Sequence, residues 1–178
     1  MRKILAIAGS NHATSIHYQL VEFTASLIEG AEVTVLDMRG WKIPVYSIDF
    51  DPDQTPNEIT ELIMLMEEYD GFIIASPEHN GSISAFFKNI LDWLSRRKKQ
   101  VFEEKPVLLM STSPSEKGGT NGLDYLLHAL PYQGAEITST FSLSSFQKNF
   151  KEGQNISPYL EDLQSHIGEF LKLILSRI

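Results

Sequence analysis

The chain has 178 residues, of which 42% are hydrophobic and 21% charged, as in an ordinary soluble globular protein. This length suggests a single domain over residues 1–178, and the lack of cysteine excludes a disulfide scaffold, a thiolate metal site and a cysteine nucleophile. The net charge of -8 argues against a general nucleic-acid binder, and no apolar run approaches the roughly 20 residues that span a membrane.

The segment Met1–Gly9 opens with basic residues and continues with an apolar stretch, like the start of a signal peptide. The apolar run covers only about six residues, whereas the hydrophobic region of a signal peptide has roughly 7–15. A buried first strand therefore fits this segment better, and we expect the protein to be cytoplasmic.

Five short apolar runs bounded by turn residues predict buried parallel strands. Segments with apolar residues at steps of three and four alternate with these runs and predict helices. The predicted strands are Lys3–Ala8, Glu32–Asp37, Gly71–Ser76, Pro106–Ser111 and Ala135–Phe141. The predicted helices are Ser15–Glu29, Pro56–Glu68, Ile83–Arg96, Gly119–Gln133 and Ser157–Arg177.

This alternation predicts an α/β fold in which helices cover both faces of a parallel sheet. Five strands favour a flavodoxin-like three-layer sandwich with strand order 2-1-3-4-5, although periodicity alone does not reveal the order of strands. In that arrangement the loops after the first, third and fourth strands meet outside the carboxyl ends of the strands. We therefore expect these three loops to build one ligand site.

Two stretches interrupt the alternation of strands and helices. Arg39–Gln54 has no clear period and predicts a long loop after the second strand. Within it, Trp41 and Tyr46 either cover the ligand site or simply pack on it. Ser142–Asn155 is polar and predicts an irregular connection.

The first predicted ligand loop, Gly9–Ser15, has the sequence G-S-N-H-A-T-S and opens a helix. Free backbone N–H groups and the positive end of the helix dipole favour an anion there. Ser10, Thr14 and Ser15 can add hydroxyl donors, so a phosphate monoester is the natural ligand. The loop has neither the dinucleotide fingerprint nor the nucleotide-binding motif that ends in G-K-[ST]. The alternative is that Ser15 only caps the helix.

The second loop, Ser76–Ser82, has the sequence S-P-E-H-N-G-S. A loop that only reverses the chain direction needs glycine or asparagine, but it has no need of a Pro-Glu-His-Asn series. Proline stiffens the start of the loop, and the next residues can present backbone N–H and C=O groups to a planar heterocycle. The alternative is a polar turn in which Ser82 caps the next helix.

The third loop, Ser111–Gly119, consists mostly of small residues and ends in a glycine pair. Small side chains permit close approach of a flat ligand, and glycine permits unusual backbone angles. Considered alone, this loop fits a plain flexible connection equally well. Together the three loops predict a pocket with an anion-binding end and a flat, backbone-lined end, and FMN has both a terminal phosphate and a flat ring.

The stretch Ser76–Arg96, S-P-E-H-N-G-S-I-S-A-F-F-K-N-I-L-D-W-L-S-R, is similar to a long signature of the NADPH-dependent FMN reductase family, P-E-Y-N-x-S-I-P-x-x-x-K-N-x-x-D-W-x-S-R. That family also includes quinone, chromate and azo-dye reductases. The first loop is similar to the family's G-S-x-R-x-x-S, and the loop before Gly118 resembles its third flavin loop. The resemblance covers roughly Lys3 to Ala135.

The resemblance implies a set of FMN-binding residues in all three loops. In the first loop it places the FMN phosphate on Ser10, Ser15 and the backbone of Ile16, with His12 at the position of the family arginine. In the other loops it places the flavin ring among Pro77, Glu78, His79, Asn80, Ser82, Thr112, Ser113 and Gly118. It also implies a homodimer or homotetramer, with each flavin near a partner subunit.

Three histidines depart from the family pattern. His12 stands in place of the arginine, His17 in place of an asparagine, and His79 in place of the tyrosine of the second loop. Arginine provides a permanent charge and a forked set of donors for phosphate, whereas histidine is mostly neutral near pH 7. We therefore expect weaker FMN retention than in a typical member.

The predicted function is that of an FMN-dependent NAD(P)H oxidoreductase, which passes electrons from a nicotinamide cofactor to a quinone, free flavin or similar small-molecule acceptor. No catalytic side chain is assigned, because the cofactor carries the chemistry. The five histidines lack metal-ligand spacing, so no metal site is expected. The basic run Arg96–Lys99 predicts a solvated helix end, with attraction of NADPH phosphates as the alternative. Two other functions stay open, an electron-carrier flavodoxin and a relative with weakened or lost FMN binding.

Overall fold

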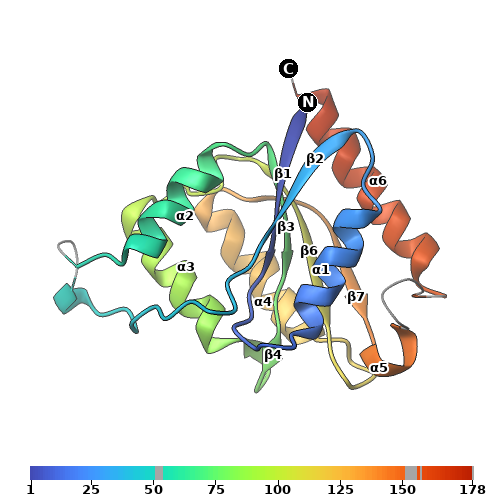
Figure 1. Ribbon diagram of the computed structural model, residues 1–178, viewed down its shortest axis with the longest axis horizontal. Helices are drawn as coiled ribbons and strands as arrows, with labels where there is room; N and C mark the ends of the chain where they lie inside the picture. The colour runs from blue at the N-terminus through green and yellow to red at the C-terminus, as the bar shows by residue number, and fades with distance from the viewer. Residues whose placement is uncertain (51–53, 151–155, 157, 178) are drawn as a thin grey trace.

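The computed structural model describes residues 1–50, 54–150, 156 and 158–177 (Figure 1). Its main feature is a five-stranded parallel sheet with the order β2-β1-β3-β6-β7. Counted among these five strands alone, this is the order 2-1-3-4-5, which confirms the predicted topology. The strands are β1 (Arg2–Ala8), β2 (Ala31–Leu36), β3 (Gly71–Ala75), β6 (Pro106–Thr112) and β7 (Glu136–Leu143).

Helices cover both faces of the sheet, as predicted (Figure 1). One face carries α1 (Ile16–Ser26) and α6 (Leu160–Ser176). The other carries α2 (Asn57–Glu67), α3 (Ala85–Arg97) and α4 (Thr120–Ala129), and α4 continues into the 3-10 turn η2 (Leu130–Gln133). Successive strand residues alternate between the two apolar cores. A strand buried on both faces has no polar side, which explains the continuous apolar runs in the sequence.

The segment between β3 and α3 is a small antiparallel hairpin, which differs from the prediction of a helix starting at Ile83. Strands β4 (Glu78–His79) and β5 (Ser82–Ile83) pair across a two-residue turn. Asn80 and Gly81 form that turn with φ of 54° and 76°, the backbone region in which Asn-Gly turns close hairpins. Consequently Ser84, and not Ser82, caps α3, and its Oγ accepts the Phe87 N–H at 3.1 Å.

The loop after β2 packs against the core formed by α2 and α3. The Trp93 Nε1–H donates to the Pro44 carbonyl at 2.9 Å, and the Tyr46 ring contacts the Trp93 ring edge-on at 5.1 Å. Trp41 also packs on this core, which favours packing over a cover for the ligand site. The loop contains the 3-10 turn η1 (Ile48–Phe50), and residues 51–53 of the predicted segment lie outside the described residues.

The segment after β7 contains more regular structure than predicted. The strand extends to Leu143, and a short helix α5 (Phe146–Asn149) follows. The Phe150 ring stacks on Phe146 at 4.5 Å and contacts Phe23 of α1 at 5.6 Å. Residues 151–155 and 157 of the predicted loop and last helix lie outside the described residues. Among the helices in the described part of the chain, none has the length and apolarity that a membrane span requires.

Candidate functional site

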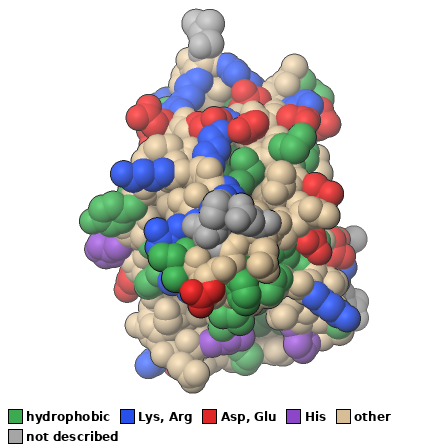
Figure 2. All heavy atoms as spheres, turned by 90° about the vertical axis from the view of Figure 1, so that its left-hand side faces the viewer, with side chains coloured by type: hydrophobic (Ala, Val, Ile, Leu, Met, Phe, Trp, Pro, Cys, Tyr) green, Lys and Arg blue, Asp and Glu red, His purple; other side chains and the backbone are tan. Residues whose placement is uncertain are grey.

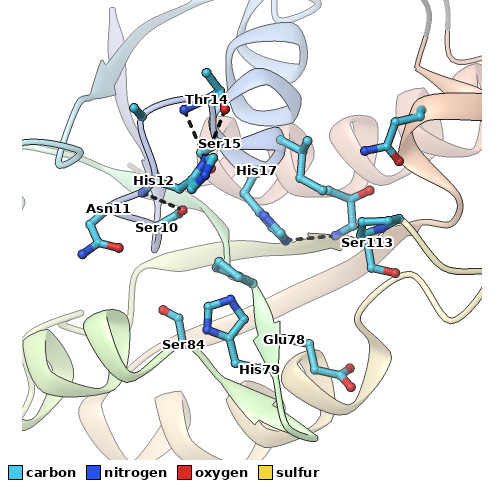
Figure 3. Close-up of a pocket in the computed structure, with 16 residues that line it drawn as sticks. Ser10, Asn11, His12, Thr14, Ser15, His17, Glu78, His79, Ser84 and Ser113 are labelled. Carbon is cyan, nitrogen blue, oxygen red and sulfur yellow. Dashed lines mark hydrogen bonds between the residues drawn. The ribbon is translucent and has the colours of Figure 1, made fainter.

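The loops after β1, β3 and β6 meet at one edge of the sheet and enclose a cavity of about 770 Å³ (Figure 3). The predicted convergence of these loops is therefore confirmed. The volume is within the ordinary range for small-molecule and cofactor sites. The lining residues are Ser10, Asn11, His12, Ala13, Thr14, Ser15, Ile16, His17, Pro77, Glu78, His79, Ser84, Thr112, Ser113, Pro114 and Gln147.

The first loop presents unused backbone donors at the start of α1. The Ser15 Oγ accepts the Tyr18 N–H at 3.2 Å, so Ser15 caps the helix. In the part of the chain that the structure describes, the N–H groups of Ile16 and His17 donate no hydrogen bond. Together with the positive end of the helix dipole, these groups form a site suited to an anion.

His12 closes the same loop on itself. Its Nδ1 accepts a hydrogen bond from the Thr14 N–H at 3.2 Å and lies 3.3 Å from the Thr14 Oγ (Figure 3). The His12 ring therefore uses the Thr14 N–H, a backbone donor of the loop that faces the cavity. An arginine side chain has no acceptor atom and could not make this contact.

Arg39 holds the first loop from outside the cavity. One of its guanidinium nitrogens donates to the Ala13 carbonyl at 3.2 Å. The guanidinium lies 4.0 Å above the Tyr18 ring and forms an ion pair with Asp37 at 2.7 Å. Hydrogen bonds from Arg39 lower the pKa of the Asp37 carboxyl to about 2. Because the Arg39 charge is paired and the residue does not line the cavity, it orients the loop.

Glu78 ties the second loop to α4. Its carboxylate accepts hydrogen bonds from the Asn121 N–H at 2.9 Å, the Asn121 Nδ2 at 2.8 Å and the Gly122 N–H at 3.4 Å. The charge of Glu78 is thus used to cap the start of α4. The neighbouring His79 side chain turns to the other side of the hairpin, toward Ser84 and His17 (Figure 3). Of the described residues that line the cavity, Glu78 alone is acidic.

The third loop follows β6 and is fixed to the neighbouring strand. The Thr112 Oγ donates to the Leu143 carbonyl at 2.6 Å. Gly118 and Gly119 have φ of 64° and 80°, and a Cβ on either would overlap a serine hydroxyl, that of Ser142 or Ser111 respectively. The glycine pair therefore serves close packing against β6 and β7.

The structure places most, but not all, of the predicted site residues on the cavity. Those that line it are Ser10, His12, Ser15, Ile16, Pro77, Glu78, His79, Thr112 and Ser113. Asn80 is exposed at the hairpin tip, Ser82 lies in β5, and Gly118 is buried against Ser142, so these three do not line the cavity.

Three of the lining residues outside the predicted set lie at the starts of α1 and α3 and in the distant helix α5. Ser84 caps α3, and its Oγ donates to the Gly9 carbonyl at 2.7 Å, so it links the second loop to the first. His17 is buried in the first turn of α1, and the signal available in the sequence was that it replaces the family asparagine. Gln147 belongs to α5, and no pattern in the sequence indicates that α5 returns to the cavity.

The basic run Arg96–Lys99 lies at the far end of α3 from the cavity. The helix has 13 residues, which corresponds to about 20 Å of length, and Ser84 at its start lines the cavity. Lys98 forms ion pairs with Glu67 at 2.7 Å and with Glu103 at 2.5 Å. Within one chain, this run is therefore a helix end and does not contact a ligand in the cavity.

Comparisons with known proteins agree with this arrangement. The sequence model of the NADPH-dependent FMN reductase family matches residues 2–148. The chain belongs to this family. The match extends slightly beyond the region of resemblance identified in the sequence, and it includes all three loops.

Individual family relatives and solved structures are similar over most of the chain. A subunit of the NADH:(hydroxy)cinnamate reductase of Vibrio ruber is 31% identical over 94% of this chain and 84% of its own length. An NAD(P)H-dependent FMN reductase of Pseudomonas aeruginosa is 27% identical over 73% of this chain and 70% of its own. The flavoenzyme NAD(P)H:(acceptor) oxidoreductase FerB of Paracoccus denitrificans superposes with a TM-score of 0.81 at 23% identity, covering 98% of both chains, which shows a shared fold.

Proposed function

We propose that this family member is an FMN-dependent NAD(P)H oxidoreductase whose flavin lies in the three-loop cavity and whose electrons pass to a small-molecule acceptor such as a quinone or free flavin. Two observations together support this proposal. The start of α1 has unused N–H donors, and a cavity of about 770 Å³ extends from them to the second and third loops. A phosphate at one end and a flat ring at the other would use both parts.

The residues present fit FMN in kind. Ser10 and Ser15 hydroxyls and the N–H groups of Ile16 and His17 would hold the phosphate. Pro77, Glu78, His79, Thr112 and Ser113 would flank the flavin ring, mainly through backbone groups and small side chains. Asn80, Ser82 and Gly118, which the family pattern also implicates, would act by shaping the second and third loops.

When bound, FMN would supply the redox chemistry by accepting electrons from NAD(P)H and passing them to the acceptor. The residues of the chain would bind the flavin, orient it and shield it. Glu78 fixes the second loop on α4, Ser84 fixes it to Gly9, and Thr112 fixes the third loop to β7. These contacts hold three loops from distant parts of the sequence in one geometry, which is what a rigid cofactor site requires.

The His12 contact favours a second candidate, a relative that has lost its flavin. Equilibrium titration with FMN, followed by flavin fluorescence, separates the two when the native chain is compared with His12→Arg. We expect both proteins to bind, with a dissociation constant roughly three- to tenfold lower for the variant, because arginine adds a permanent charge at the phosphate. Binding by the variant alone would favour the relative without flavin.

We also propose that residues 1–178 form one cytoplasmic domain that associates as a homodimer or homotetramer. Apolar side chains that emerge among charged ones on the side of α2 and the loop after β2 support a contact with a second copy (Figure 2). Val45 is 79% exposed and Ile48 is 75% exposed. Light scattering should give the mass of an oligomer, and Ile48→Lys should lower it. A native mass equal to that of one chain would contradict this proposal.

A further inference from the structure

His17 lines the cavity and connects two of its loops. It is the second residue of α1, only 5% of its surface is exposed, and its side chain lines the cavity. The ring extends from the start of α1 toward the loop after β6 (Figure 3). There its Nε2 lies 3.4 Å from the Thr112 backbone nitrogen and accepts that N–H.

This contact determines the tautomer of the ring. A backbone N–H can only donate, so Nε2 must carry its lone pair, and a neutral imidazole then has its hydrogen on Nδ1. In the described part of the structure, no hydrogen-bond acceptor contacts His17 Nδ1. His17 therefore has one ring nitrogen used within the protein and one N–H donor that the protein leaves unused.

The surroundings of His17 keep the ring neutral. Burial lowers the pKa of His17 to about 4 from its ordinary value of 6.5, although a backbone hydrogen bond with Thr112 acts to raise it, and the charge of the nearby His79 lowers it further. The positive end of the α1 dipole also disfavours a cation in the first turn. The ring is thus a neutral donor near neutral pH.

We infer that His17 is a ligand-binding residue whose neutral Nδ1–H donates to an oxygen of the ribityl phosphate chain of the flavin, while its Nε2 positions the third loop through Thr112. The inference rests on the proposed function, since it requires FMN in this cavity. It follows from position: His17 extends from the first turn of α1, where the unused N–H groups lie, to Thr112 of the third loop, and both residues line the cavity. A chain of hydroxyl and phosphate oxygens is the part of FMN that connects the anion-binding end of the site to the flat end.

Three substitutions of His17 distinguish the contribution of Nδ1 from that of Nε2. Asparagine at position 17 places an N–H donor close to the Nδ1 position but cannot reach Thr112. Glutamine reaches the Nε2 position with an acceptor but loses the donor at Nδ1. Phenylalanine keeps the size of the ring and removes both groups. His128→Phe is the matched control, because His128 is exposed on α4 and does not line the cavity.

Titration of the four variants and the native chain with FMN tests the inference. We expect roughly tenfold weaker FMN binding for His17→Phe and His17→Gln, and binding within about threefold of the native chain for His17→Asn and His128→Phe. Titration with riboflavin locates the accepting oxygen. A loss for both ligands indicates a ribityl hydroxyl, and a loss for FMN alone indicates the phosphate.

Equal losses for His17→Asn and His17→Phe would overturn the inference, as would FMN binding by His17→Phe that equals that of the native chain. A native chain that binds no FMN would instead contradict the proposed function itself. Long-range ¹H–¹⁵N spectra of the imidazole provide a readout that does not depend on affinity. They should show hydrogen on Nδ1 and none on Nε2 near neutral pH, and the opposite tautomer would also overturn the inference.

Discussion

Three histidines line the same cavity, but their exposure to solvent differs. His12 and His79 are exposed, whereas only 5% of the surface of His17 is accessible. An imidazolium ion at the buried position loses its hydration and gains no carboxylate partner. Single side chains therefore contribute differently to this site: His17 acts as a neutral donor, and His12 presents a ring at the solvent-facing side of the first loop.

The buried histidine predicts a specific dependence of stability on pH. The folded chain protonates His17 only near pH 4, whereas the unfolded chain protonates it near 6.5, so the unfolded state binds more protons between these values. The free energy of unfolding should fall as the pH drops from 6.5 toward 4, with a contribution of about 2 kcal/mol from this group at about pH 5.

His17→Gln should remove that contribution, because glutamine does not titrate. Urea unfolding at about pH 7.5 and about pH 5 measures the difference for the native chain and for the variant. His128→Gln, which changes an exposed histidine on α4, should keep the native dependence on pH. An equal loss of stability in acid for the native chain and His17→Gln would contradict the assignment of a buried neutral ring.

At the scale of elements, the glycine pair at the end of the third loop determines how α4 approaches β6. Gly119 has a φ of 80°, and a Cβ there would overlap the Ser111 hydroxyl, which donates to the Ser76 carbonyl at 2.9 Å. This hydroxyl links the second loop to the third. Packing at Gly119 therefore affects the relative position of two flavin loops.

Gly119→Ala should destabilise the chain by about 2–4 kcal/mol, through backbone strain and through displacement of the Ser111 hydroxyl. Gly81→Ala is the matched control, since its φ of 76° is similar but no atom lies within 4 Å of the added Cβ. It should cost only about 1 kcal/mol. In a Ser111→Ala background, Gly119→Ala should cost less than in the native chain, as measured by urea unfolding in a double-mutant cycle. Equal costs at the two glycines would show that the overlap is unimportant.

At the scale of the whole molecule, the sheet and the convergence of its loops could be predicted from sequence. Strands buried on both faces read as continuous apolar runs, and five of them separated by helical patterns leave few topologies. Parallel strands bring their carboxyl ends to one edge, so loops from three separate parts of the sequence could be assigned to one site.

The remaining features depend on contacts that a sequence pattern does not contain. Asn-Gly is a typical hairpin turn, but the strands that flank Asn80 and Gly81 have only two residues each, which is too short for a periodic strand pattern. The approach of α5 to the cavity depends on how Phe146 and Phe150 pack against α1, and the role of Glu78 depends on where α4 begins. Tertiary packing, and not local pattern, decides these positions.

The visible absorption spectrum of the purified chain tests the proposed function most directly. The chain is incubated with FMN, separated from free flavin, and then treated with NADH or NADPH in the absence of oxygen. We predict a protein-bound flavin spectrum that bleaches on addition of the nicotinamide cofactor and returns on addition of menadione. A chain that stays colourless, and that oxidises neither NADH nor NADPH when FMN and menadione are supplied, would contradict the assignment of an FMN-dependent oxidoreductase.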